Sequence, residues 1–148
     1  THESALEWWV LRYGEHAGVQ QWIADLNALY RREKALHEID FDPAGFEWID
    51  CNDAEASVLS FLRRPREGPP VLVVCNFTPV PRIDYVVGVP QGGFWRELLN
   101  SDARPYGGSG IGNLGGVEAA PVPAHGRFHS LSLHLPPLAT VFLKPENV

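Results

Sequence analysis

The first third of the chain repeats its apolar residues at the spacing of a helix. Between residues 19 and 30 they recur every three or four positions and so lie on one face; they are Val19, Trp22, Ile23, Leu26, Leu29 and Tyr30. Three basic residues follow, Arg31, Arg32 and Lys34, and positive charge favours the negative end of a helix dipole. A helix of this length is only marginally stable alone in water, so its apolar face needs another element to pack against.

After a turn signal at residues 42–45, the apolar period changes from that of a helix to that of strands. Short segments rich in β-branched and aromatic residues follow, separated by Gly, Pro, Asn or Asp; they span residues 46–49, 57–63, 71–77, 85–89, 94–98, 131–135 and 140–143. Residues 131–135 alternate strictly, with leucines on one face. Residues 71–75 are apolar throughout, as in a strand that is buried on both faces.

No helical pattern interrupts these segments, so we expect an antiparallel sheet. So many short strands within roughly a hundred residues are typical of a β-sandwich or barrel. The sequence therefore predicts a mainly β fold, an antiparallel β-sandwich preceded by one N-terminal α-helix.

Residues 100–127 are rich in glycine and hold almost no large apolar side chains, although strand-like segments flank them. Loops longer than about 12–15 residues are uncommon in compact domains and are often functional. Residues 110–115, G-I-G-N-L-G, satisfy the glycine pattern of a dinucleotide site. Such a site needs a strand before it and a helix after it, and neither flank suits. We therefore interpret this segment as an ordered excursion along the sandwich and not as a nucleotide site.

The composition is that of a soluble globular domain, with 148 residues, 45% of them hydrophobic and 20% charged. A net charge of −6 argues against a nucleic-acid partner, which needs clustered Lys and Arg. No run approaches the ~18 apolar residues of a membrane span and no signal peptide is visible, so we expect a cytoplasmic protein with no membrane partner. Cys51 and Cys75 fit reduced thiols. The chain begins without Met, which suggests a piece of a longer protein.

Familiar catalytic and metal-binding patterns are missing from the sequence. The acidic stretch at residues 50–55 lacks the glycine and glutamate of a calcium loop and is more typical of a polar hairpin turn. The histidines form no zinc pattern, no G-x-S-x-G frames a serine, and the glycosylation pattern at Asn76 has no secretory context. Nothing places two carboxylates across a sugar ring, as glycoside chemistry requires, although four lie close in sequence: Glu47, Asp50, Asp53 and Glu55. We assign no catalytic residue, no metal ligand and no cofactor.

Three aromatic residues are candidates for stacking on sugar rings: Trp48, Trp95 and Tyr106. Trp48 and Trp95 lie in strand-like segments, where packing in the core is the alternative interpretation. Tyr106 lies in the glycine-rich segment, and both interpretations of it stay open.

Several phrases occur in one order along the chain: HAGVQQWIADLNALYRREKALHEIDFDPAGFEWID, SVLSFLRR, VVCNFTPVPR, WRELLNSD, YGGS, HGR and SLSLHLPPLATVFL. Together they closely resemble the C-terminal end of bacterial 1,4-alpha-glucan (glycogen) branching enzymes of the alpha-amylase superfamily. The resemblance covers the chain from about His16 onward. It implies that residues 1–36 are the end of a catalytic (β/α)8 barrel, including its last helix, and that residues 37–148 are the C-terminal all-β sandwich.

Members of this family cleave an α-1,4-glucan chain and transfer the piece to a 6-hydroxyl, which forms an α-1,6 branch. They use an Asp nucleophile and a Glu acid/base on earlier barrel strands, and the resemblance implies that this chain carries neither. We therefore expect a non-catalytic domain that supports the barrel of the same parent chain, in an enzyme that acts on α-glucan. An accessory glucan-binding module is the alternative.

Overall fold

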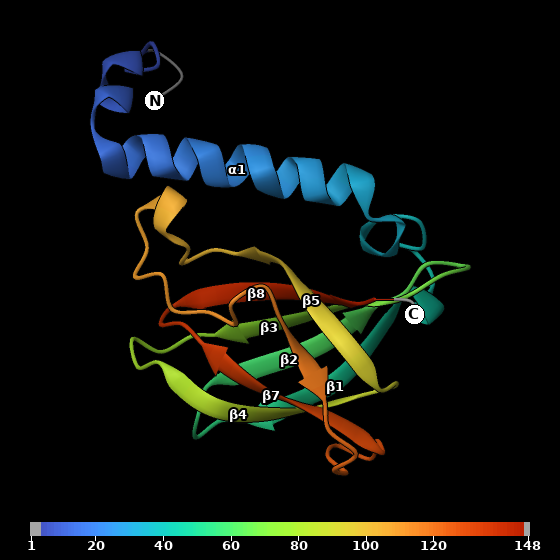
Figure 1. The fold of residues 1–148 in the computed structure, drawn as a ribbon. Helices are drawn as coiled ribbons and strands as arrows, with labels where there is room; N and C mark the ends of the chain where they lie inside the picture. Colours follow the sequence, from blue (N-terminus) through green and yellow to red (C-terminus); the bar gives the residue numbers. More distant parts are fainter. Residues whose placement is uncertain (1–3, 147–148) are drawn as a thin grey trace.

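The computed structural model describes residues 4–146, and in that range the chain forms one α-helix followed by strands. The helix α1 spans Gly14–Arg32 and follows a short 3-10 turn, η1, at Trp8–Arg12. Two more 3-10 turns, η2 at Lys34–Leu36 and η3 at Pro43–Gly45, lead from the helix into the first strand. A fourth turn, η4 at Arg104–Tyr106, lies under the N-terminal half of α1 (Figure 1).

The strands form two antiparallel sheets. The larger sheet has the order β1-β2-β3-β8-β5-β6, and the smaller sheet pairs β4 with β7. The strand bounds are β1 Phe46–Asp53, β2 Val58–Arg63, β3 Val71–Asn76, β4 Arg82–Val89, β5 Gly93–Asn100, β6 Gly116–Ala119, β7 His129–Leu135 and β8 Ala139–Pro145. The prediction of a mainly β, antiparallel fold with an N-terminal helix is confirmed.

The main core lies between the two sheets. The alternating leucines of β7 all point inward, because Leu131, Leu133 and Leu135 have at most 1% of their surface exposed. An isolated bridge between Ala120 and Ser130 connects the β6 side of the larger sheet to β7. Within the described residues, β1 and β4 share no backbone ladder, so side chains must close the opposite side of the sandwich.

A second core lies outside the sandwich, where α1 and η2 cover part of the larger sheet (Figure 1). Leu29 of the helix is 1% exposed and packs with Val71 and Val73 of β3. At the end of the helix, Lys144 of β8 donates a hydrogen bond of 2.6 Å to the buried carboxylate of Glu33. Strand β3 is therefore buried on both faces, as its continuous apolar sequence predicts.

Two details differ from the sequence-based expectation. The apolar stripe of α1 does not pack as one face, because Leu29 is buried whereas Val19, Ile23 and Tyr30 are about half exposed or more. Strand β6 was not expected, since it lies inside the glycine-rich segment. Its four residues carry no alternating apolar pattern, and pairing with β5 supplies the order that the local sequence does not signal.

Candidate functional site

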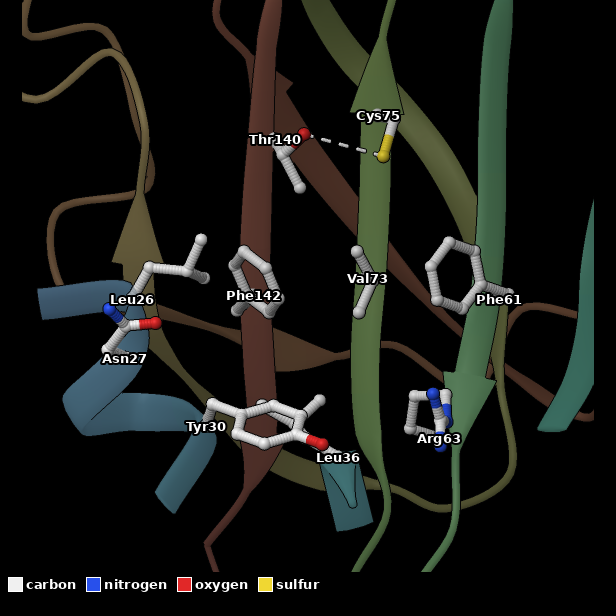
Figure 2. Close-up of a pocket in the computed structure, with 10 residues that line it drawn as sticks. All are labelled: Leu26, Asn27, Tyr30, Leu36, Phe61, Arg63, Val73, Cys75, Thr140 and Phe142. Carbon is white, nitrogen blue, oxygen red and sulfur yellow. Dashed lines mark hydrogen bonds between the residues drawn. The ribbon is translucent and has the colours of Figure 1, made fainter. Parts of the chain in front are cut away.

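An open apolar groove runs between α1 and the outer face of the larger sheet. Figure 2 shows Leu26 and Tyr30 of the helix beside Phe142, Val73 and Phe61, which project from three neighbouring strands. The groove has a volume of about 560 Å³, and its lining residues are Leu26, Asn27, Tyr30, Leu36, Phe61, Arg63, Val73, Cys75, Thr140 and Phe142. Its lining is mainly apolar, so it suits an apolar partner better than a charged ligand.

Strand alternation produces the floor of the groove. In β2, Leu62 points into the main core while its neighbours Phe61 and Arg63 point to the outer face. In β8, Val141 and Leu143 are buried inside, which turns Phe142 outward. Because several outward positions are also apolar, the outer face of the sheet is not the polar surface that a sandwich usually presents.

An aromatic cluster extends this apolar surface toward the edge of the sheet. The ring of Phe46 stacks on Phe61 with a centroid distance of 5.1 Å and meets Trp48 edge-on at 4.8 Å. Trp48 and Phe61 are also in edge contact, at 5.8 Å. Trp48 remains 49% exposed, so part of its indole is open to solvent.

Polar side chains border the groove at one end. Arg63 forms an ion pair with Asp40, and the hydroxyl of Tyr30 lies 3.4 Å from the same carboxylate. The hydrogen bond from Arg63 holds the pKa of Asp40 below its usual value. At the other end, burial raises the pKa of the Cys75 thiol, whose sulfur accepts a hydrogen bond from Thr140 at 3.4 Å.

Tyr106 fastens the glycine-rich segment to the helix. Its ring meets Trp22 edge-on at a centroid distance of 5.3 Å, and its hydroxyl donates a hydrogen bond of 2.6 Å to Asp25. The helix approaches so closely that a Cβ on Gly18 would lie 2.5 Å from the carbonyl oxygen of Tyr106. Burial and the bond to Asp25 raise the pKa of Tyr106 to about 12. Both its ring and its hydroxyl are thus engaged inside the domain.

Trp95 lies in the main core and is 0% exposed. Its indole N–H donates to the carbonyl oxygen of Gln91 at 3.2 Å. No face of this ring is open to a sugar, so we leave Trp95 out of any proposed binding surface. Of the three aromatic candidates, Trp48 alone keeps an exposed ring, and the structure does not bring the three together.

Three carboxylates of β1 contact groups on the other side of the open seam, the gap between β1 and β4. Glu47 pairs with Arg127 as well as with Arg64, which directly follows β2. Asp50 lies 3.4 Å from the His125 ring. Asp53 accepts a hydrogen bond of 2.6 Å from the hydroxyl of Tyr85 in β4. These carboxylates therefore act as structural ties, and none has its oxygens free for a pair of catalytic acids.

The pKa shifts of these carboxylates agree with that arrangement. The Tyr85 hydroxyl holds the pKa of Asp53 below its usual value. Burial alone would raise the pKa of Glu47, but the hydrogen bond from Arg64 and the charges of Arg64 and Arg127 outweigh it, so the pKa is lowered. Both groups are held in their ionised form.

The remaining sequence patterns lie in structural positions. The glycine pattern at residues 110–115 leads into β6 and not into a helix, and Asn113 ties it to Glu97 through a side-chain hydrogen bond of 2.7 Å. Asn76 is 2% exposed and donates to the carbonyl oxygens of Val80 and Pro136, so it does not present a glycosylation acceptor. Both cysteines are free thiols.

The described residues offer neither a metal site nor a membrane-spanning helix. Within residues 4–146, no three side chains of His, Cys, Asp or Glu are grouped so that they could hold a metal ion. The helix of that same part of the chain is not both long and apolar enough to cross a membrane. The groove was missed at the sequence level, although the two-sided apolar pattern of β3 is a signal that this sheet has cover on both faces.

Relatives with established names match nearly the whole chain. A 1,4-alpha-glucan branching enzyme GlgB from Aromatoleum aromaticum is 67% identical over 99% of this chain and 23% of its own length. The GlgB of Aquifex aeolicus is 61% identical over 99% of this chain and 23% of its own length. The GlgB of Albidiferax ferrireducens is 58% identical over 97% and 23%. The chain thus spans less than a quarter of the length of these relatives.

A family model assigns the class of domain, and a solved structure gives only a weak match. A solved structure of the trehalulose synthase MutB is 22% identical, covers 81% of this chain and 16% of its own, and has a TM-score of 0.46, too low to add to the assignment. The family described as alpha amylase, C-terminal all-beta domain, matches residues 48–146, well over half of the chain. The chain therefore belongs to the alpha-amylase C-terminal all-beta domain family.

Proposed function

We propose that this chain is the non-catalytic C-terminal domain of a 1,4-alpha-glucan branching enzyme and that it supports the catalytic barrel of its parent. The observation that carries the proposal is the pattern of coverage. Enzymes of that name match 97–99% of this chain at 58–67% identity, whereas the chain accounts for only 23% of each of them. The remaining length is ample for a separate catalytic domain, which would transfer an α-1,4-glucan segment to a 6-hydroxyl.

The amount of exposed surface is consistent with a domain that packs against the catalytic barrel. The chain exposes 9019 Å². A compact monomer of 16.4 kDa is expected to expose about 7,500 Å², so roughly 1,500 Å² is in excess. That excess is larger than the ~800 Å² that one partner contributes to an ordinary protein interface. A surface of this size fits a domain that is covered by the rest of its parent chain.

The exposed apolar side chains lie where such cover is expected. On α1, Val19 is 61% exposed and Ile23 48%, in contrast to the buried Leu29. Trp8 and Trp9 of η1 are 66% and 53% exposed and continue this surface toward the N-terminus. Together with the groove, they form the patch that we assign to contact with the barrel. Large exposed apolar patches mark interaction surfaces.

Reconstitution tests this assignment. We expect a branching enzyme from Aromatoleum aromaticum that lacks its matching C-terminal region to lose solubility and branching activity, and to regain both when this chain is added. The Ile23→Glu variant should fail to restore them, whereas Ala24→Glu, at an exposed position on another side of α1, should succeed. Full activity of the truncated enzyme without this chain would refute the supporting role. Branching is followed by the loss of iodine staining of amylose.

The chain alone is expected to leave amylose unchanged, because its β1 carboxylates are held by structural partners. Incubation with amylose should release no reducing ends and should not alter iodine staining. Any turnover that survives removal of contaminating amylase would contradict the non-catalytic role.

A second candidate function, glucan binding, is favoured by Trp48. Its ring is 49% exposed and is held by Phe46 and Phe61, so it is a rigid aromatic platform at the edge of the sheet. Titration with maltoheptaose should then shift the Trp48 indole N–H signal in the NMR spectrum at millimolar ligand. Trp48→Ala should abolish binding, and Trp9→Ala, another exposed tryptophan, should not. Unchanged spectra at millimolar ligand would leave the supporting role alone.

A further inference from the structure

The HGR hairpin, residues 124–127, closes the seam at which β1 and β4 share no backbone ladder. Ala124 and Arg127 pair through two backbone hydrogen bonds of 3.0 and 2.9 Å. Between them, His125 and Gly126 have φ angles of 49° and 72°. Positive φ at both loop positions is the type I′ turn, in which Asn and Gly are preferred. The backbone of a histidine at the first position is strained, so we expect contacts of its side chain to offset the cost of that strain.

The imidazole of His125 connects the two sheets. Its Nδ1 accepts a hydrogen bond of 3.0 Å from the backbone N–H of Gly88 in β4, and its Nε2 lies 3.4 Å from Oδ2 of Asp50 in β1. The hairpin is closely seated there, because a Cβ on Gly88 would lie 2.1 Å from the carbonyl oxygen of Ala124. A backbone N–H only donates, so Nδ1 is the nitrogen without a proton, and the proton of the neutral ring lies on Nε2.

We propose that His125 is a proton-sensitive latch, in which protonation of Nδ1 releases Gly88 and uncouples the HGR hairpin from β4. The proton comes from water and binds to the atom that accepts the Gly88 hydrogen bond. Two donors then face each other, and that bond is lost. The charged ring keeps its Nε2–H toward Asp50, where a carboxylate strengthens the contact. The neutral His125 side chain thus contacts both sheets, whereas the charged side chain contacts only Asp50 of the larger sheet.

The charged groups around the ring come from three elements. From β1, the carboxylates of Asp50 and of the more distant Asp53 face the ring. From β4, the Gly88 N–H donates to Nδ1, and the charged Arg82 lies farther along, near Asp53. From the hairpin, Arg127 donates to the carbonyl oxygen of His125 and pairs with Glu47 of β1. The ion pair between Arg127 and Glu47 does not depend on the protonation of His125, so the released hairpin stays attached to β1.

An NMR titration of the whole chain tests the latch. The Gly88 amide and the His125 ring are followed from roughly pH 8 to pH 5, the range in which imidazoles titrate. We expect both signals to move with one midpoint, and the protection of the Gly88 amide against exchange to fall on the order of tenfold. The amide of Val73, in β3, should stay protected. A Gly88 amide that keeps its shift and protection while His125 titrates would overturn the proposal.

A pair of variants gives a second, independent readout. His125→Asn suits the positive φ of the turn but does not titrate, so the pH dependence of the Gly88 amide should disappear. His134→Asn is the matched control, because the His134 ring lies against the Asp84 amide, 3.4 Å away, nearer the start of β4. It should leave the Gly88 response intact. A response that survives in His125→Asn would assign the pH dependence to another group and refute the latch. The wild-type titration stands even if one variant folds poorly.

Discussion

Tyr106 illustrates what a single residue does in this domain. The sequence leaves it open between sugar stacking and packing, because its neighbours are mostly glycines. Its actual partners, Trp22 and Asp25, lie in a helix about eighty positions earlier in the chain. Such a contact is fixed by the fold and has no local signature. By contrast, Trp95 lies in a strand with an apolar neighbourhood, and its burial could be anticipated as the alternative.

Tyr106→Phe should change the ionisation of Asp25. The Tyr106 hydroxyl, followed by the amide of Gln21, lowers the pKa of Asp25 in the folded chain. Without the hydroxyl, that pKa should rise toward its ordinary value, as measured by the carboxyl carbon shift during an acid titration. A folded carboxyl with a lowered pKa adds stability above its unfolded pKa and loses it in acid. The stability difference between the two proteins should therefore shrink as pH falls. An unchanged Asp25 titration would contradict this role of Tyr106.

Asn113→Ala should be strongly destabilising for one residue of a glycine-rich segment. Asn113 is 7% exposed; its amide donates to Glu97 at 2.7 Å and its oxygen accepts from the backbone N–H of His134 at 2.8 Å. Its removal leaves the partly buried Glu97 carboxylate and His134 N–H without these contacts, which costs about 2 kcal/mol of unfolding free energy. Urea denaturation measures the loss, and exposed Asn27→Ala should stay within about 0.5 kcal/mol. Equal midpoints for the two variants would contradict the assignment.

Among the elements, those with a strong period could be predicted and the weak ones could not. Strand β7 alternates cleanly and β3 is apolar throughout, and both lie where the sequence places them. Strand β6 has four residues that begin with glycine, and its order comes from β5. The helix was predicted, but which part of its apolar stripe faces the sheet depends on tertiary packing. Periodicity alone identifies an apolar stripe on the helix but does not identify the element against which it packs.

The attachment of α1 to the sandwich is tested by a pair of neighbouring positions. Trp22 packs against Tyr106 and is partly buried, so Trp22→Ala should lower the free energy of unfolding by about 2 kcal/mol, less than the ~3–5 kcal/mol of a fully buried Trp. Ile23 is 48% exposed, and Ile23→Ala should change it by no more than about 0.5 kcal/mol. Thermal and urea unfolding compare them. If Trp22→Ala melts like the wild type, the helix does not depend on the sandwich for its stability.

At the scale of the whole molecule, the sandwich is joined by backbone on one side and by side chains on the other. The bridge from Ala120 to Ser130 connects the sheets on the first side, and the β1 carboxylates connect them on the second. The sequence predicts the two layers of the sandwich but not how the sides of the sandwich are joined. The sequence assigns these carboxylates no catalytic role and no partner, because their partners lie in β4 and in the HGR hairpin, distant in sequence.

This arrangement predicts that acid destabilises the whole domain. In the folded chain the pKa values of four carboxyls are lowered, those of Asp25, Asp40, Glu47 and Asp53. Their contribution is complete above the unfolded values of about 4 and is lost as pH falls through the lower folded values. The urea midpoint should therefore fall steeply below about pH 4. Asp53→Asn should make the fall shallower, and a midpoint at pH 3 equal to that at pH 6 would contradict the linkage.

The two free thiols of the chain have different surroundings. Cys75 lines the groove, whereas Cys51 lies exposed on β1. An alkylating reagent therefore meets one sulfur that is sensitive to whatever fills the groove and one that is an internal reference. Because burial raises the pKa of Cys75, its labelling is slow and best followed in mildly alkaline solution. The ratio of the labelling rates of Cys75 and Cys51, measured by mass spectrometry, therefore reports whether the groove is occupied, without any substitution in the chain.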